Sequence, residues 1–364
     1  MGSPVHKAGA DRYSRDKVAA DFERSGADWA VVLYDPWVYT DANWDPFRGI
    51  DRVLNWTPVD HYPIPLSMMP WLKGHGGIAM SAFGRDSMLQ TAEANGGFPV
   101  FYAPHAIERV WHPRDRSTFR LAHDIPADAF LVGIVAANIG TAIYDRKNFS
   151  GMFHAMAAFM ARRPDAYLYI HSNKLGWEGA RLPDVVRHMG LDEKRIRWVD
   201  QYAYAEGGIS DDDMADAYSA MDVLLATSRG EGFGLPVLEA QACGTPVIVS
   251  NWTAQAELVG DGPWTPATSR AAKHPSGWLV SVQPEMDFKH YGNFAFPSIH
   301  ETVAALDDAH DSASTMREAA VAKAASWDAD AVFEEHWRPI LRAMESAMGK
   351  ETRQQRRAKK RRAA

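Results

Sequence analysis

Residues 228–250 read Ser-Arg-Gly-Glu-Gly-Phe-Gly-Leu-Pro-Val-Leu-Glu-Ala-Gln-Ala-Cys-Gly-Thr-Pro-Val-Ile-Val-Ser, and this stretch decides the fold. The apolar run 223–226 before it predicts a buried parallel strand, and residues 246–250 predict the next one. Between them, three alternating glycines predict a tight loop. Pro236 then suits the first turn of a short helix, and Gly244 suits its end. The unit is therefore strand, glycine loop, helix, strand.

This unit predicts a site for an anion, and a diphosphate fits best. The amides of the loop and the start of the helix, from Gly232, Phe233 and Gly234 to Leu235, would donate to it. Glu231 lies in the loop, and Glu239 follows eight residues later, about two helical turns on. Two carboxylates so placed can accept hydrogen bonds from hydroxyl groups on both sides of a bound diphosphate.

The stretch resembles the E-x7-E signature of family-4 retaining glycosyltransferases over about 20 residues. This resemblance implies an α/β protein of the GT-B fold, with two Rossmann-like domains whose parallel sheets face each other across a cleft. It also implies a nucleotide-diphosphate sugar as donor, with Glu231 holding the sugar's hydroxyls and Glu239 those of the ribose. A dinucleotide-binding loop fits less well, because the third glycine of that motif would fall on Val237.

Strands alternating with helices along the rest of the chain predict parallel sheets in two domains. We expect an acceptor-side domain over residues 1–112, shorter than the family's, and a nucleotide-sugar domain over 113–328. Residues 329–349 are expected to form a closing helix that crosses back to the first domain. Residues 350–364 form a basic tail that is expected to be disordered.

A second group of donor-binding candidates follows the first strand of the second domain. Asn138 begins a loop there, and Arg146 and Lys147 are expected to open a helix that runs to Arg162. Cations are disfavoured at the start of a helix, so a phosphate is the better reason for this basic pair. Lys147 also resembles the lysine that contacts the donor's phosphates in the family.

Other candidates come from the ends of predicted strands. Gln201 and Tyr202 follow a strand where the family binds the nucleotide base. His61, in a loop held by three prolines, resembles a histidine that faces the reacting sugar, although a loop histidine is often simply exposed. Glu257 resembles an acid that either faces the site or caps a helix.

The run Asp211–Asp213 raises the question of a metal site. Ser210 precedes it and an apolar-periodic helix follows, so we interpret the run as a helix N-cap. The resembling enzymes neutralise the diphosphate with basic residues and a helix dipole. No metal ligand and no cofactor are therefore expected.

The whole chain of 364 residues is 46% apolar and 23% charged, which is ordinary for a globular protein. It lacks an apolar run long enough for a membrane span and a leader for export, and its single cysteine, Cys243, fits a reducing compartment. We therefore expect a cytoplasmic location. The net charge is −7, and the tail's eight basic residues and one acid leave −14 on the body.

The expected partners are a UDP- or GDP-sugar and an acceptor that is a glycan, a protein or a small molecule. The basic tail is suited to an acidic partner. Two other functions use the same fold. A GT-B phosphorylase or sugar-nucleotide epimerase would be told apart by its products, and a non-catalytic carbohydrate-binding relative by its lack of turnover.

Overall fold

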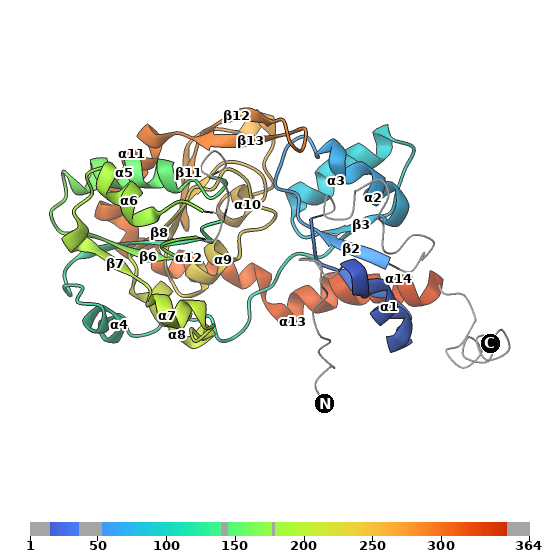
Figure 1. Ribbon diagram of the computed structural model, residues 1–364, viewed down its shortest axis with the longest axis horizontal. Helices are drawn as coiled ribbons and strands as arrows, with labels where there is room; N and C mark the ends of the chain where they lie inside the picture. The colour runs from blue at the N-terminus through green and yellow to red at the C-terminus, as the bar shows by residue number, and fades with distance from the viewer. Residues whose placement is uncertain (1–14, 36–52, 140–144, 177–178, 348–364) are drawn as a thin grey trace.

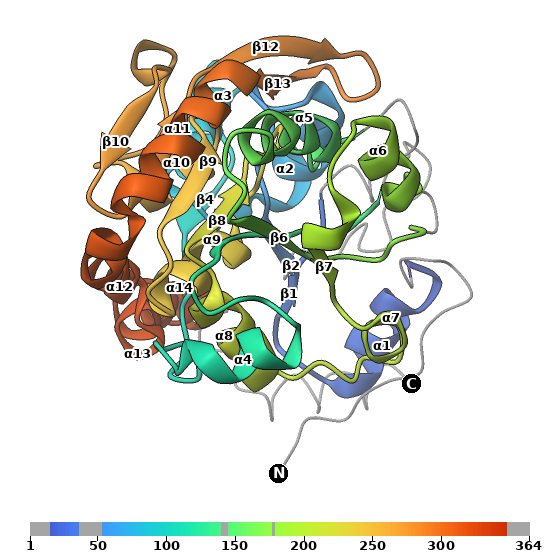
Figure 2. The same ribbon diagram turned by 90° about the vertical axis from the view of Figure 1, so that its left-hand side faces the viewer.

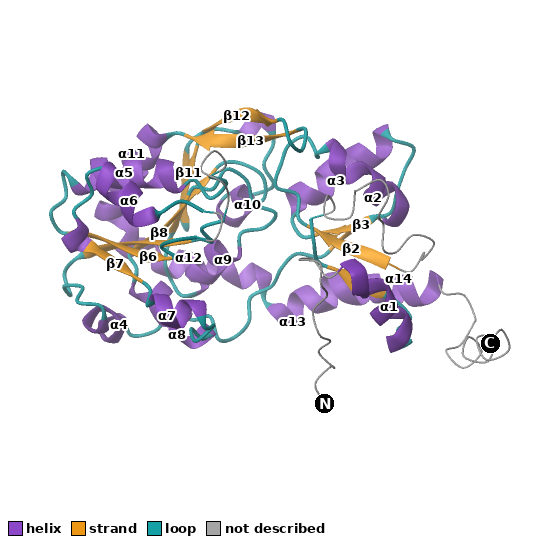
Figure 3. Ribbon diagram, viewed as in Figure 1, coloured by secondary structure: helices purple, strands orange, loops and turns teal. Residues whose placement is uncertain are grey.

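The computed structural model describes residues 15–35, 53–139, 145–176 and 179–347. Two sheets with helices packed against them form two domains that lie side by side (Figures 1 and 3). This is the α/β architecture that the sequence predicts. The basic tail, 350–364, lies outside the described residues.

The first domain has a four-stranded parallel sheet in the order β1-β2-β3-β4. Its strands are short: β1 Ala30–Val32, β2 Val53–Thr57, β3 Gly77–Ala79 and β4 Val100–Tyr102. Its helices are α1 Arg15–Ser25, α2 Met69–His75 and α3 Ala82–Ala94. The side chain of Ser81 accepts a hydrogen bond from the amide of Gly84 and so caps α3.

The second domain has a seven-stranded sheet in the order β10-β11-β9-β8-β5-β6-β7, parallel except for β10. Its strands are β5 Phe130–Val135, β6 Ala166–His171, β7 Ile196–Trp198, β8 Val223–Ala226, β9 Val247–Ser250, β10 Ala272–His274 and β11 Gly277–Val280. The central strands are apolar throughout because helices cover both faces of the sheet.

Alternate residues of β5 enter two separate apolar clusters, one on each face of this sheet. One face is covered by α5 Phe149–Met160, α6 Leu182–His188 and α11 Ile299–Ser312. The other is covered by α4 Arg116–Ala122, α8 Asp211–Ala220, α9 Leu235–Ala242, α10 Gln255–Val259 and α12 Arg317–Ala324. Figure 2 looks onto this layered arrangement from the side of the second domain.

The last helices return to the first domain. They are α13 Ala329–Val332, a π-helical turn over Phe333–Trp337, and α14 Arg338–Ala347. Ile340 and Met344 of α14 pack with Leu54 and Ile78 of the first sheet, which lies beside α14 in Figure 1. The end of the described chain therefore contributes to the core of the domain with which the chain begins.

A β-hairpin that the sequence analysis did not predict lies where the two domains meet (Figure 1). Its strands are β12 Val282–Asp287 and β13 Gly292–Pro297. Asn293 and Tyr62 exchange two backbone hydrogen bonds of 3.1 and 3.3 Å. This pairing attaches the proline-rich loop of the first domain to the hairpin.

Apolar packing also joins the domains. Val59, Ile64 and Phe83 of the first domain share one buried cluster with Trp252 and Trp264 of the second. Such a dry contact resists separation, because opening it would expose large aromatic surfaces to water. The domains are thus held firmly on this side of the cleft.

Glu257 of α10 completes the joint between the domains. Its two carboxylate oxygens accept hydrogen bonds from the amides of Ala82 and Phe83, at 2.9 and 3.0 Å. Glu257 therefore caps α3 of the other domain, which decides between the two roles expected for it. Burial raises its pKa to about 6. No helix within the described ranges is long and apolar enough to cross a membrane.

Candidate active site

A cavity of about 480 Å³ lies between the domains and is lined from both sides. The first domain contributes residues of the segments after β1, β2, β3 and β4. The second contributes the segment after β5, the basic pair, the glycine loop and the hairpin. The described lining comprises Asp35, Pro58, Asp60, His61, Met80, His105, Ala137, Ile139, Arg146, Lys147, Glu231, Gly232, Phe233, Gly234, Leu235, Pro236, Lys289, His290 and Phe294. Eight of the twelve predicted site residues are among these.

The glycine loop connects β8 to α9, as predicted, but its glycines serve two different needs. Gly234 has φ 112°, a left-handed conformation that favours glycine. A Cβ on Gly230 would lie 2.1 Å from the carbonyl oxygen of Asp60, and one on Gly232 would lie 2.4 Å from the Cβ of Pro58. We expected the glycines to admit a ligand, whereas Gly230 and Gly232 admit the first domain's loop.

Glu231 lies at the centre of the charged groups in the cavity. One of its carboxylate oxygens lies 2.5 Å from Nζ of Lys147, and the other lies 3.5 Å from Nη1 of Arg146. Its backbone is fixed by Thr253, whose hydroxyl accepts from the Glu231 amide and donates to its carbonyl, both at 3.1 Å. Burial favours the neutral acid, but the two cations outweigh it and lower the pKa of Glu231.

Arg146 and Lys147 lie before helix α5 and not in its first turn, so the predicted helix start at Arg146 is wrong. A turn over residues 145–148 precedes the helix, and Asn148 in it has φ 59°. The carboxylate of Asp145 accepts hydrogen bonds from the amides of Phe149 and Ser150 at the start of α5. The basic pair thus extends from a turn into the cavity. Burial lowers the pKa of Lys147, although Glu231 opposes this shift.

His61 lines the cavity, but carboxylates occupy both of its ring nitrogens. Nδ1 lies 2.6 Å from Asp60 and Nε2 lies 3.3 Å from Asp287 of the hairpin. Burial alone would lower the pKa of His61, but the charge of Asp60 and the hydrogen bonds to both carboxylates raise it. His61 is only 4% exposed, so the alternative of a simply exposed loop histidine is wrong, and its role in facing a reacting sugar stays a prediction.

Two acids on the first-domain side were missed by the sequence analysis. Asp60 lies 3.7 Å from Arg146. The positive charges of His61 and Arg146 hold the pKa of Asp60 well below its usual range, although burial opposes this shift. Burial and the nearby Asp60 raise the pKa of Asp35 to about 7. Both residues follow predicted strands, so their position at the edge of a parallel sheet was the available signal.

Four predicted residues lie outside the described lining of the cavity. Glu239 is on α9, where it accepts a 2.8 Å hydrogen bond from the hydroxyl of Tyr218 and where burial raises its pKa to about 7. Asn138 is buried, and its amide bonds Ala180 and Asn173, so it holds two loops together.

The segment after β7 forms the short helix α7, Gln201–Ala205. The Gln201 side chain bonds the backbone of Lys174, Ser172 and Val199, so it ties strand ends together. Tyr202 is 78% exposed. A role for these two residues at a nucleotide base remains a prediction.

The acidic run forms the first turn of α8, and Ser210 just before it is the N-cap, so the predicted helix start lies here. The hydroxyl of Ser210 accepts from the amide of Asp213, and the Asp213 carboxylate accepts from that of Ser210. The Asp213 carboxylate therefore belongs to a capping box. Cys243 is buried, and burial raises its pKa to about 12, so it is a packing residue and not a nucleophile.

Comparison with known proteins agrees with this geometry. Residues 134–286 match the family model of the glycosyl transferases group 1. The chain is 37% identical over 126 residues to the O-antigen chain mannosyltransferase B of Escherichia coli, covering 35% of this chain and 31% of that one. It is 32% identical over 163 residues to a D-inositol 3-phosphate glycosyltransferase of Saccharomonospora viridis, covering 41% and 35%. The chain thus spans about a third of the length of these relatives.

Solved structures extend the likeness to nearly the whole chain. Sucrose-phosphate synthase from Thermosynechococcus elongatus superposes with a TM-score of 0.67 at 18% identity, covering 95% of this chain and 82% of that one. Anabaena HepE, solved in complex with UDP-glucose, superposes with a TM-score of 0.62 at 16% identity, covering 92% and 82%. The chain therefore has the GT-B fold, and residues 134–286 of its second domain match the glycosyl transferases group 1 family model.

Proposed function

We propose that the protein transfers a sugar from a nucleotide-diphosphate donor to an acceptor with retention of configuration. The observation that carries the proposal is the contact of Glu231 with Lys147 and Arg146 beside the start of α9, in a cavity lined by both domains. A carboxylate, two cations and a set of backbone amides are the groups that a sugar and a diphosphate require together.

In this proposal, each charged group of the free protein exchanges its partner when the donor binds. The diphosphate takes the place of Glu231 beside Lys147 and Arg146, and Glu231 then accepts hydrogen bonds from the sugar's hydroxyls. Departure of the nucleoside diphosphate builds negative charge, which the two cations and the amides of Gly232 to Leu235 stabilise as it forms. The diphosphate needs no metal ion here.

The other elements of the site have complementary roles. Glu239 would accept from the ribose hydroxyls, as the resemblance to family 4 implies. The first-domain wall, with Asp35 and His105, would receive the acceptor. The curated relatives include mannosyltransferases, and HepE was solved with UDP-glucose, so UDP- and GDP-hexoses are the donors to test first.

Thermal unfolding in the presence of UDP, GDP and ADP tests donor binding. Ligand at 100 times its Kd stabilises the folded state by about 2.7 kcal/mol, so one of the three is expected to raise Tm clearly. Lys147→Ala should weaken that shift, whereas Lys73→Ala, on the distant helix α2, should keep it. Equal and negligible shifts with all three nucleotides would contradict the proposal.

A further inference from the structure

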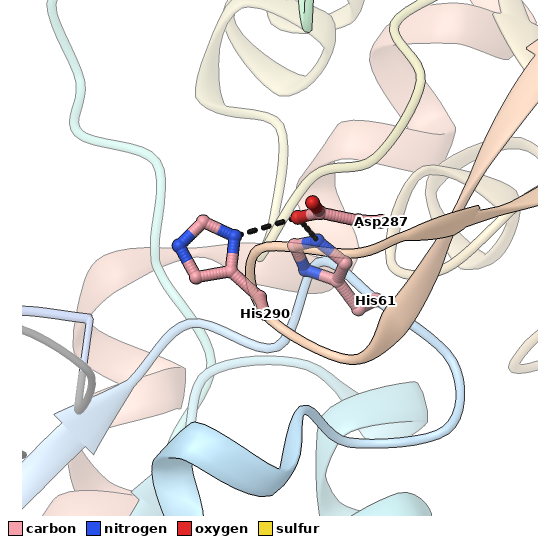
Figure 4. Close-up of side chains that lie close together, drawn as sticks. All are labelled: His61, Asp287 and His290. Carbon is pink, nitrogen blue, oxygen red and sulfur yellow. Dashed lines mark hydrogen bonds and ion pairs between the residues drawn. The ribbon is translucent and has the colours of Figure 1, made fainter.

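His61, Asp287 and His290 converge at the edge of the cavity in an arrangement that the proposed transfer does not use (Figure 4). One nitrogen or oxygen atom from each residue lies within 4.8 Å of the others. Asp287 Oδ2 is shared, at 3.3 Å from Nε2 of His61 and 2.6 Å from Nδ1 of His290. We name these three residues the hairpin site.

We infer that the hairpin site binds a divalent transition metal ion of the zinc class, with a fourth coordination position open to the cavity. Two imidazoles and one carboxylate are ligands that zinc accepts, whereas Mg²⁺ prefers oxygen ligands alone. His61 and His290 also line the cavity, so a bound ion would be within reach of an oxygen ligand there.

The distances are close to those that such an ion needs. Ligand atoms about 2.0–2.2 Å from zinc lie roughly 3.3 Å apart at a tetrahedral angle. The His61–Asp287 pair already has this separation, and the His290–Asp287 pair, hydrogen-bonded at 2.6 Å, must part by about 0.7 Å.

Neighbouring groups hold the ligands in place. Asp60 lies 2.6 Å from Nδ1 of His61, which leaves Nε2 directed at Asp287. A carboxylate behind a ligating imidazole is the usual support of a zinc histidine. The other oxygen of Asp287 accepts a 2.9 Å bond from the amide of Lys289. The site is therefore oriented before any ion arrives.

Burial and backbone packing give the site the rigidity that metal binding rewards. His61, Asp287 and His290 are exposed by only 4%, 7% and 8%. A Cβ on Gly292 would lie 2.9 Å from the Cβ of His61, so glycine is needed for the hairpin to approach the loop this closely. Two carboxylates, Asp60 and Asp287, also meet at one imidazole, and a dication would balance their charge.

The site joins two segments more than two hundred residues apart, since His61 comes from the first domain and the other ligands from the hairpin. Bound metal would therefore also cross-link the hairpin to the first domain. The inference rests on this geometry alone, and it holds whether or not the protein transfers sugars.

Calorimetric titration with ZnCl₂ and with MgCl₂ tests metal binding at the hairpin site. The sample is the full chain, freed of metal with EDTA and without affinity tag or nucleotide. We expect one Zn²⁺ per chain and no heat from Mg²⁺. Asp287→Asn and His290→Gln should each weaken Zn²⁺ binding at least about tenfold, and Asp60→Asn about 10- to 100-fold. His154→Ala, an exposed histidine on α5, should bind as the wild type does.

Co²⁺ titrated into the wild type gives a second readout that does not depend on the folding of a variant. Visible d–d bands that saturate at one equivalent and vanish on adding Zn²⁺ would support the hairpin site. The inference is overturned if the folded wild type takes up neither ion, because the three residues then share protons only. It is equally overturned if His290→Gln binds Zn²⁺ as tightly as His154→Ala does.

Discussion

At the scale of single residues, the site is a set of charges that satisfy one another until a ligand arrives. Glu231 pairs with Lys147 and Arg146, Arg146 also lies near Asp60, and Asp60 and Asp287 hold His61 between them. Buried charges persist only when they are paired in this way. In a ligand that carries a diphosphate and hydroxyl groups, the diphosphate can replace Glu231 beside Lys147 and Arg146, and the hydroxyls can donate to Glu231. We therefore infer such a donor.

The protonation of Glu239 should make the affinity for the nucleoside diphosphate depend on pH. Burial raises its pKa to about 7, so the carboxylate becomes protonated as the pH falls through 7 and loses its charge-assisted hydrogen bonds. The affinity for the nucleoside diphosphate should therefore fall by up to about tenfold between pH 8 and pH 6. Calorimetry at several pH values measures this, on the wild type and on Glu239→Gln.

In Glu239→Gln, this part of the pH dependence should disappear, and the affinity at pH 8 should be lower by about 1.5–3 kcal/mol. The second phosphate ionisation of the nucleotide affects both proteins equally, so the difference between the two profiles is decisive. Identical profiles would show that Glu239 does not contact the nucleotide.

The sequence alone identified the charged residues of the glycine loop and of the basic pair, but not the contacts between segments that lie far apart along the chain. Glu231 and Lys147 belong to local patterns, a glycine loop and a strand-end turn, which can be recognised without the rest of the fold. The contact of His61 with Asp287 depends on a hairpin 226 residues away, and no local pattern reports such a distance. The structural uses of Asn138 and Gln201 were missed for the same reason, since their partners are backbone groups of other loops.

At the scale of elements, the glycine loop is also a joint between the domains. Gly232 faces Pro58 so closely that a methyl group cannot fit without movement. Gly232→Ala should therefore push the two domains apart at the cavity and lower the free energy of unfolding by about 1–3 kcal/mol. Nucleotide affinity should fall with it, because the same loop supplies the amides. Chemical denaturation and calorimetry measure the two effects.

Gly74→Ala is the matched control. A Cβ at this position in α2 would meet nothing within 4 Å, so the change should be neutral or stabilise the helix by up to about 1 kcal/mol. If Gly232→Ala were as stable as Gly74→Ala and bound nucleotide normally, the loop would not be the joint described.

The strands were predictable because a parallel sheet buried on both faces demands continuous apolar runs, as in Val223–Ala226 and Val247–Ser250. The start of α5 was not predictable, because the acceptor for its first amides is Asp145, which lies before the basic pair and outside the helix. The hairpin was missed because most of β12 is exposed and its middle carries Pro284 and Glu285, which are unfavourable in a buried strand. Its two strands pair with each other and not with the larger sheet, so the sheet gave no clue to it.

At the scale of the whole molecule, an apolar cluster, the hairpin and the Glu257 cap on α3 unite the two domains. The basic tail is expected to take no part in this, because its composition cannot build a core and its like charges repel. Deleting residues 350–364 should leave Tm and nucleotide affinity unchanged. A fall in Tm of several degrees on scanning calorimetry would show that the tail contributes to the fold.

Turnover of the donor tests the central claim most directly. The full chain is incubated with UDP- and GDP-hexoses in EDTA, and release of the nucleoside diphosphate is followed beside the anomeric configuration of the product by NMR. We predict release from one donor with retention. Glu231→Gln should cut the rate by about 10- to 100-fold and leave the affinity for the nucleoside diphosphate intact or higher, since Lys147 is then unpaired. Undiminished turnover in the folded Glu231→Gln variant, or inversion of the sugar, would contradict it.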